Sequence, residues 1–208
     1  MLKIWSERGY NKAHPGERKC FAMNKRMDIR RLCLLGVLTA LVFAGNFARI
    51  VLPIAVGGTT AFTLGNIMCV LSGLLMGPVG CLASGIGAAL YDLTNPLYIS
   101  EVPFTFLNKL VMGLVAGLIA HWGKTEGKYG RCLIAAAAGC VAYYVLYFLK
   151  SYYYNALFLQ GLPSQTAWVA LLDKIPASIF NGVLAVVVAP PLCLAIRAAL
   201  RRAHLKLA

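Results

Sequence analysis

Residues 131–150 read RCLIAAAAGCVAYYVLYFLK, an apolar run closed by one arginine and one lysine. At 1.5 Å per residue, a helix over this run is about 30 Å long, which is the thickness of the hydrocarbon core of a bilayer. The whole chain shares this character: 60% of its 208 residues are hydrophobic, 13% are charged, and the mean hydropathy is +0.71. A water-soluble domain of this size has no core large enough for so much apolar surface. The sequence therefore predicts an integral membrane protein.

Apolar runs of similar length recur along the chain and predict an all-α bundle of six transmembrane helices. The second and third runs are short and meet at Gly77-Pro78, and Pro190-Pro191 is expected to interrupt the sixth. The connections are too short for another domain, so we predict one membrane domain over residues 31–208 after a basic tail over residues 1–30. Met23 and Met27 are alternative starts. The predicted spans cover about residues 31–52, 61–76, 79–93, 103–122, 131–159 and 167–189.

The net charge of +13 suggests a nucleic-acid binder at first sight, but the basic residues are distributed as in a membrane protein. Nine of the twenty precede the first span, and two further groups follow the fourth and sixth spans. Six spans bring these groups to one side, which the positive-inside rule assigns to the cytoplasm. We therefore expect cytoplasmic termini, a multi-pass protein of the cell membrane and no nucleic-acid partner. The two later groups are Lys124, Lys128 and Arg131, and Arg197, Arg201, Arg202 and Lys206.

Charged residues within or beside the spans gather in the half predicted to face outward. Each costs at least about 2.5 kcal/mol at the bilayer centre unless it pairs or lines a polar cavity. Mutual pairing with snorkelling lysines is one explanation, and a cavity open to the outside is the other. The one-sided clustering favours the cavity. The residues are Arg49, Asp92, Glu101, Lys109, Lys150, Asp173 and Lys174.

Residues three and four apart share a helix face, and three predicted spans carry polar or aromatic stripes at this spacing. Such stripes on consecutive helices converge on a pocket that suits a small, flat, polar organic molecule. Interfacial tyrosines are also common in membrane proteins, so part of the pattern has a simpler explanation. The stripes are Thr105, Asn108 or Lys109, and Met112; Tyr143, Tyr147, Lys150 and Tyr154; and Lys174, Ser178 and Asn181.

Small residues form lines along four of the predicted spans. Most of these lines are expected to pack within the bundle, as at Gly73/Gly77, Gly80/Ser84/Ala88 and Gly113/Gly117. The longest line lies on the first span and is the best candidate for docking a partner helix. It consists of Gly36, Ala40, Ala44 and Ala48.

Motifs for catalysis and for metal binding are absent from the sequence. There is no Walker A motif, so ATP hydrolysis by a P-loop is excluded, and there is no HExxH or paired Cys/His spacing. We therefore predict no enzyme activity, no cofactor and no metal, and any energy that the protein needs must come from partners.

Four segments resemble the substrate-binding S components of energy-coupling factor (ECF) transporters, the bacterial vitamin importers, in the branch named after riboflavin. The similarity covers about residues 30–200, and the Ala40-xxx-Ala44 spacing resembles the alanine motif with which S components dock. The segments are Phe62-Thr63-Leu64-Gly65-Asn66, Gly77-Pro78-Val79-Gly80, Tyr91-Asp92-Leu93 and Pro103-Phe104-Thr105-Phe106-Leu107-Asn108-Lys109.

The resemblance implies a subunit of the bacterial plasma membrane that captures a vitamin or precursor near the outer face. A transmembrane coupling subunit and two ATPase subunits are the implied partners, and Ala40, Ala44 and Ala48 the docking residues. Gly57 and Gly58 are the predicted gate, since glycine eases the backbone changes of a lid. The predicted substrate contacts are Arg49, Asn108, Lys109, Tyr147, Lys150, Lys174 and Asn181.

The alternative is a membrane scaffold or small membrane enzyme in which the outer charges pair only to hold helices together. The vitamin, the use of a dedicated or shared energising module, and whether Asp92 and Lys109 pair with each other or bind substrate stay open at this point.

Overall fold

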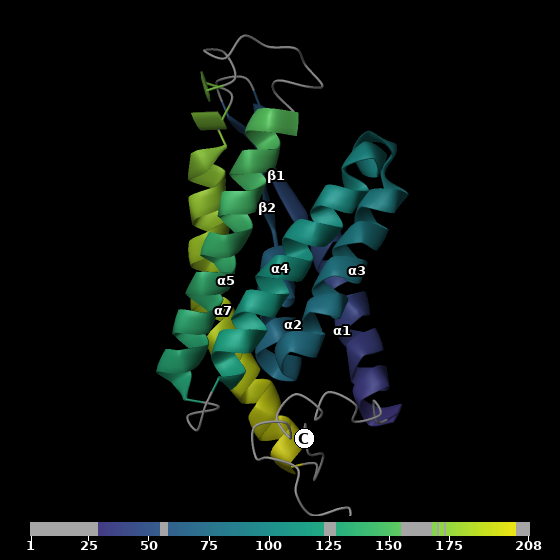
Figure 1. The fold of residues 1–208 in the computed structure, drawn as a ribbon, viewed down its shortest axis with the longest axis vertical. Coiled ribbons are helices and arrows are strands. Elements are labelled where there is room, and N and C mark those ends of the chain that lie inside the picture. The colour runs from purple at the N-terminus through teal and green to yellow at the C-terminus, as the bar shows by residue number, and fades with distance from the viewer. Residues whose placement is uncertain are drawn as a thin grey trace, which may run out of the picture. The chain divides into compact units, whose positions relative to one another are not determined.

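A computed structural model describes residues 29–54, 58–122, 128–154, 168–169, 171–172 and 174–202. The predicted tail lies outside the described residues as far as residue 28. The chain divides into the units Met1–Leu32 and Cys33–Ala208, and the contacts below lie within the second. The elements in Figure 1 are α1 (Ile29–Phe47), β1 (Arg49–Ile54), β2 (Gly58–Thr63), α2 (Gly65–Met76), the 3-10 turn η3 (Gly77–Val79), α3 (Gly80–Thr94), the 3-10 turn η4 (Pro96–Glu101), α4 (Val102–His121), α5 (Tyr129–Lys150) and α7 (Ile175–Arg202).

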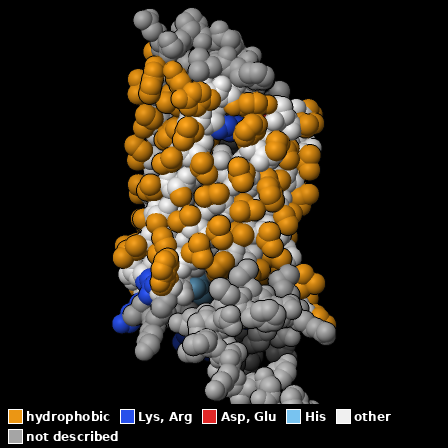
Figure 2. All heavy atoms as spheres, in the orientation of Figure 1, with side chains coloured by type: hydrophobic (Ala, Val, Ile, Leu, Met, Phe, Trp, Pro, Cys, Tyr) orange, Lys and Arg blue, Asp and Glu red, His pale blue; other side chains and the backbone are white. Residues whose placement is uncertain are grey.

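The spanning character of the helices follows from their length and composition. Among the described residues, four segments are long and apolar enough to cross a membrane, and Arg31–Phe47 is a shorter apolar helix. Figure 2 shows hydrophobic side chains covering most of the visible face of the described residues, as expected for a surface in contact with lipid. The protein is a predominantly helical, multi-pass membrane protein. The four segments are Gly65–Thr94, Tyr98–His121, Tyr129–Tyr154 and Ile175–Arg202.

The segment Gly65–Thr94 is a hairpin of two short helices, α2 and α3, that meet at η3. Gly77 turns the chain with a φ of 66°, a conformation that favours glycine. The hairpin lies at the centre of the fold. In its most apolar stretch of 18 residues, 67% of the residues are buried, compared with 28–33% in the corresponding stretches of the other three segments. The hydroxyls of Ser72 in α2 and Ser84 in α3 lie 2.7 Å apart and hold the two helices together.

Glycines allow the backbones of the hairpin and α4 to approach closely. A Cβ atom at Gly80 would overlap the carbonyl oxygen of Ser72, and one at Gly73 would overlap the carbonyl of Gly113 in α4. α4 also packs along α3, beside which it runs in Figure 1. The small-residue lines of these segments therefore serve packing within the protein.

α1 packs on α3 with one face and leaves its small-residue line exposed. A Cβ atom at Gly87 of α3 would lie 2.7 Å from the carbonyl oxygen of Thr39. Val42 on the same face of α1 is fully buried. Gly36, Ala40, Ala44 and Ala48 are exposed, and nothing lies within 4 Å of a Cβ atom built at Gly36.

An antiparallel ribbon connects α1 to α2, which corrects the predicted span limits. β1 pairs with β2 from Arg49↔Thr63 to Ile54↔Gly58. The first helix therefore ends at Phe47 instead of near residue 52, and α2 begins at Gly65 instead of near residue 61. Isoleucine, valine and threonine in these stretches favour extended backbone, and apolar composition alone does not separate a strand from a helix.

α7 continues through Pro190 and Pro191, so the prediction that these residues interrupt the sixth span is wrong. Prolines are tolerated in membrane helices when neighbouring helices support the local backbone, and Pro190 is fully buried in the bundle. Beyond the prolines, Arg197 donates a 2.6 Å hydrogen bond to the carbonyl oxygen of Leu74 in α2. This contact holds the last turns of α7 against the hairpin.

Candidate functional site

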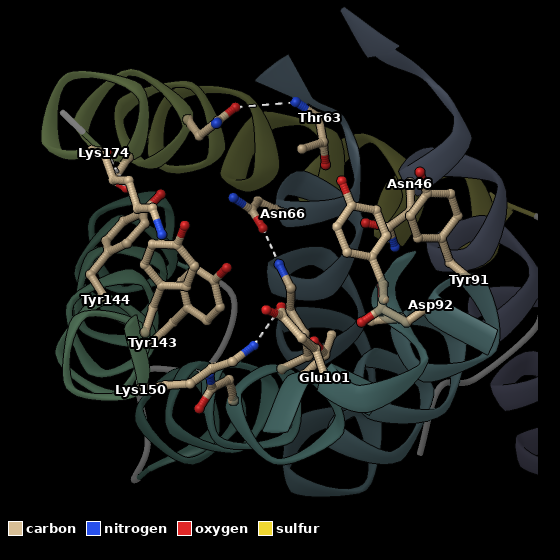
Figure 3. Close-up of a pocket in the computed structure, with 18 of the residues that line it drawn as sticks. Asn46, Thr63, Asn66, Tyr91, Asp92, Glu101, Tyr143, Tyr144, Lys150 and Lys174 are labelled. Atoms are coloured by element: carbon tan, nitrogen blue, oxygen red, sulfur yellow. Dashed lines mark hydrogen bonds and ion pairs between the residues drawn. The ribbon is translucent and has the colours of Figure 1, made fainter. Parts of the chain in front are cut away.

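A cavity of about 330 Å³ lies where the ribbon, the start of α2, the end of α3 and the ends of α4, α5 and α7 meet (Figure 3). Its size is within the range of small-molecule sites in proteins. Its walls are mostly amide, hydroxyl, charged and aromatic groups, contributed by Asn46, Thr63, Asn66, Ala88, Tyr91, Asp92, Tyr98, Glu101, Thr105, Asn108, Lys109, Tyr143, Tyr144, Tyr147, Lys150, Lys174, Ala177, Ser178 and Asn181.

The structure brings all the predicted substrate contacts except Arg49 to this cavity. The backbone of Arg49 lies in β1 opposite Thr63, which lines the cavity, but its side chain is outside the described part. Of the predicted gate, Gly58 begins β2, and Gly57 lies outside the described residues. The contacts that line the cavity are Asn108, Lys109, Tyr147, Lys150, Lys174 and Asn181.

Lys109 is buried in the wall of the cavity, with 6% of its surface exposed. Its ammonium group donates a hydrogen bond to the amide oxygen of Asn66 and lies 4.3 Å from the centre of the Tyr143 ring. Asp92 lines the same cavity, yet these two described residues, Asp92 and Lys109, form no ion pair. The Asp92 carboxylate and the Lys109 ammonium group therefore both line the cavity without a direct ion pair between them.

The other two lysines of the cavity have different partners. Lys150 forms a 2.7 Å ion pair with Glu101, which links the end of α5 to η4. Lys174, just before α7, donates a 2.8 Å hydrogen bond to the hydroxyl of Ser151. The first lysine is thus neutralised by a carboxylate, whereas the second is held by an uncharged group.

Three tyrosines of α5 form an aromatic wall. The rings of Tyr143 and Tyr147 are stacked with centres 5.8 Å apart, and Tyr144 meets Tyr143 edge-on at 5.0 Å. The hydroxyl of Tyr144 is buried and has no hydrogen-bond partner among the described residues. Tyr154, on the same predicted stripe, packs on Phe104 with centres 4.4 Å apart. The wall therefore offers flat surfaces and the Tyr144 hydroxyl, which has no hydrogen-bond partner in the part of the chain that the structure describes.

Asn181 connects the cavity to the ribbon. Its side-chain oxygen accepts a 3.2 Å hydrogen bond from the backbone N–H of Thr63, the last residue of β2. The Thr63 hydroxyl in turn accepts a 3.0 Å hydrogen bond from the N–H of Gly65 at the start of α2. Asn181 thus holds the end of the ribbon against α7 at the edge of the cavity.

The described residues contain no group of three or more His, Cys, Asp and Glu side chains that could hold a metal ion. The chemistry on the cavity wall is that of binding: hydrogen-bond donors and acceptors, ring faces and fixed charges.

Comparison with known families decides between the two sequence-based explanations. A family model described as the S component of ECF-type riboflavin transporters matches residues 26–198. The chain belongs to this family. It is therefore the membrane-embedded, substrate-binding subunit of an ECF-type importer, in a family of transporters and not of enzymes. A comparison with curated proteins gives no match.

Several residues that line the cavity of this S component were not among the predicted contacts. Asn66 belongs to a quoted family-like segment, and Tyr91 precedes Asp92 in another, so the motifs marked their neighbourhood without indicating a role. No sequence motif or stripe indicated that Asn46 or Tyr144 would line the cavity. Asn46 lies near the end of α1, and Tyr144 lies one position beside the predicted stripe of α5.

Proposed function

We propose that this S component binds a vitamin-like organic molecule with a flat ring system in the cavity and carries it inward. The single observation behind the proposal is the convergence of the polar stripes of α4, α5 and α7 on one cavity lined by tyrosine rings. The family is described by riboflavin, so riboflavin-type molecules are the first candidates. The substrate contacts would be Asn108, Lys109, Tyr147, Lys150, Lys174 and Asn181, with Arg49 reaching the site from β1.

The topology proposed for this function has six spans, with α2 and α3 each counted as one, and both termini in the cytoplasm. Support comes from Arg131, Arg201 and Arg202, which lie at the ends of α5 and α7 far from the cavity residues of the same helices. Basic residues prefer the cytoplasmic side, so the cavity would open outward in a bacterial plasma membrane. The ribbon would cover it, with Gly57 and Gly58 as the gate.

Transport would require docking on a transmembrane coupling subunit that is driven by two ATPase subunits. The proposed docking surface is the exposed line of Gly36, Ala40, Ala44 and Ala48 on α1, because small residues allow a partner helix to approach closely. Residues 31–208 would form the substrate-binding domain, and residues 1–30 a basic tail on the cytoplasmic side.

The test is mass spectrometry of small molecules released by denaturing the protein after purification in mild detergent. A stoichiometric vitamin-like mass is expected from the wild type, and the Lys109→Ala/Asn181→Ala variant should lose it because both side chains line the cavity. Lys128→Ala, an exposed lysine before α5, is the matched control and should retain the mass. No bound molecule, followed by no thermal shift with a vitamin panel, would contradict the proposal.

A further inference from the structure

The contact between Lys109 and Asn66 fixes the orientation of a buried amide in the cavity wall. Both side chains line the cavity, and both residues are buried, with 6% and 5% of their surfaces exposed. The Lys109 ammonium group carries hydrogen-bond donors and no acceptor, so the amide atom that it contacts must be the oxygen. The NH₂ end of Asn66, with two donors, is therefore turned away from Lys109.

The donor end of Asn66 faces the tyrosines of α5. Figure 3 shows its amide nitrogen on the side of the cavity where Tyr143 and Tyr144 lie. Tyr144 also lines the cavity, and its buried hydroxyl has no hydrogen-bond partner among the described residues. One donor group from α2 and one from α5 thus lie on the same side of the cavity.

Gly182 of α7 makes room for the Tyr144 ring. A Cβ atom at Gly182 would lie 2.8 Å from Cε2 of Tyr144 and 3.2 Å from its hydroxyl oxygen. The ring therefore packs directly on the backbone of α7, and it also meets Tyr143 edge-on at 5.0 Å. This packing determines where the Tyr144 hydroxyl lies without giving it a hydrogen-bond partner.

Buried donors in proteins are normally hydrogen-bonded, because a donor without an acceptor costs free energy. Donors at a cavity wall therefore indicate an acceptor atom in the ligand. A ring carbonyl oxygen fits this place, since it is uncharged and its two lone pairs accept from two donors at once. The ring that carries it would contact the stacked faces of Tyr143 and Tyr147.

We infer that Asn66 and Tyr144 determine specificity by donating hydrogen bonds to one ring carbonyl oxygen of a flavin-type substrate. The inference rests on the proposed function and assigns the carbonyl edge of the ring to this side of the cavity. Lys109 acts here as a positioning residue, because it holds the amide oxygen of Asn66 and so keeps the NH₂ group turned toward the substrate.

Riboflavin and its 2-thio and 4-thio analogues are suitable probes. Each analogue replaces one ring carbonyl oxygen by sulfur, which accepts hydrogen bonds weakly. Titration calorimetry on the purified, ligand-free S component gives the ratio of the dissociation constants of analogue and riboflavin. Weakening two neutral hydrogen bonds corresponds to roughly tenfold in affinity, so this ratio should be about ten for at least one analogue. The analogue that responds identifies the carbonyl group.

Two variants connect the ratio to the donors. Tyr144→Phe removes only the hydroxyl, and Asn66→Asp keeps the size of the side chain and an acceptor for Lys109 but has no N–H donor. Each should weaken riboflavin binding by roughly tenfold and lower the ratio to about three, because one of the two hydrogen bonds is gone. Tyr129→Phe, at an exposed tyrosine outside the cavity at the start of α5, is the matched control and should retain both wild-type values.

Lys109→Met tests the positioning role. Without the ammonium group, the Asn66 amide is free to turn its oxygen toward the substrate, so the ratio should fall to about three, as in Asn66→Asp. Loss of a direct contact between Lys109 and the substrate would instead weaken riboflavin and its analogues alike and leave the ratio unchanged. An unchanged ratio would overturn the positioning role.

The outcomes separate this inference from the proposed function. A wild-type ratio near one for both analogues, no binding of riboflavin, or a ratio that either Tyr144→Phe or Asn66→Asp leaves unchanged would overturn the inference. The wild-type ratio needs no variant, so it tests the inference even if a variant does not fold. The proposed function fails only if no molecule copurifies with the wild type and a vitamin panel gives no thermal shift.

Discussion

The α2–α3 hairpin and the cavity both contain buried polar groups, but these groups have very different surroundings. In the hairpin, the Ser84 hydroxyl contacts the Ser72 hydroxyl at 2.7 Å and donates to the carbonyl oxygen of Cys69 at 3.0 Å. In the cavity, the Tyr144 hydroxyl has no hydrogen-bond partner among the described residues, and Lys174 has only a serine hydroxyl. Groups satisfied within the protein stabilise the fold, whereas groups with unused capacity are available to a ligand. Substitutions in the two regions should therefore change different measurements.

The largest effect is expected for Gly80→Ala in the hairpin. The added Cβ atom would overlap the carbonyl oxygen of Ser72 and approach its carbonyl carbon to 2.6 Å, so the backbone of α2 or α3 must move. Because α4 packs on both helices, we expect a loss of about 3 kcal/mol in the free energy of unfolding. Thermal unfolding in detergent measures it. Gly36→Ala is the matched control, since its Cβ atom meets nothing within 4 Å, and it should unfold no earlier than the wild type.

An intermediate effect is expected for Ser84→Ala. The substitution removes the hydrogen bonds to Ser72 and to the Cys69 carbonyl, so stability should fall by about 1 kcal/mol. Ligand affinity should stay at the wild-type value, because Ser84 does not line the cavity. Calorimetric titration and thermal unfolding of the same preparation measure both quantities. A tenfold loss of affinity with unchanged stability would show that the two regions are not separate in function.

The smallest effect on stability is expected for Tyr144→Phe. Unlike the Ser84 hydroxyl, the hydroxyl that this substitution removes has no hydrogen-bond partner among the described residues. A buried hydroxyl without a partner contributes nothing favourable, so stability should be unchanged or should rise by up to about 1 kcal/mol. Affinity for the copurified ligand should fall by roughly tenfold if the hydroxyl bonds to it. Unchanged affinity would mean that the ligand does not use this group, and the comparison with Ser84 would then rest on the lysines alone.

The polar stripes could be predicted because helical periodicity is a local property. Asn108 and Lys109, Tyr147 and Lys150, and Lys174 and Asn181 all lie on the cavity wall, as their spacing along three segments suggested. Tyr144 could not be predicted in this way, because it lies one position beside the stripe of α5. Its side chain lines the cavity because α5 packs against α7 in the folded protein.

The limits of the elements were harder to predict than their existence. Hydropathy indicates apolar residues without indicating whether they form a helix or a strand, so it predicts parts of β1 and β2 as the ends of two helical spans. Pro190 and Pro191 read as an interruption because a proline lacks the N–H donor, yet packing against the bundle sustains the helix through them.

By itself, the sequence determined that this chain resides in a membrane, which runs of it are apolar, and on which helix faces the polar residues lie, because composition and periodicity act over a few turns. Only the tertiary structure decided the partners: Lys150 with Glu101, Lys109 with Asn66, and Thr63 of the ribbon with Asn181 of α7. These contacts join residues 43 to 118 positions apart in the sequence. Which of the described charged groups in the cavity form an ion pair depends on these contacts, since pairing is a property of distances in space and not of spacing along one helix.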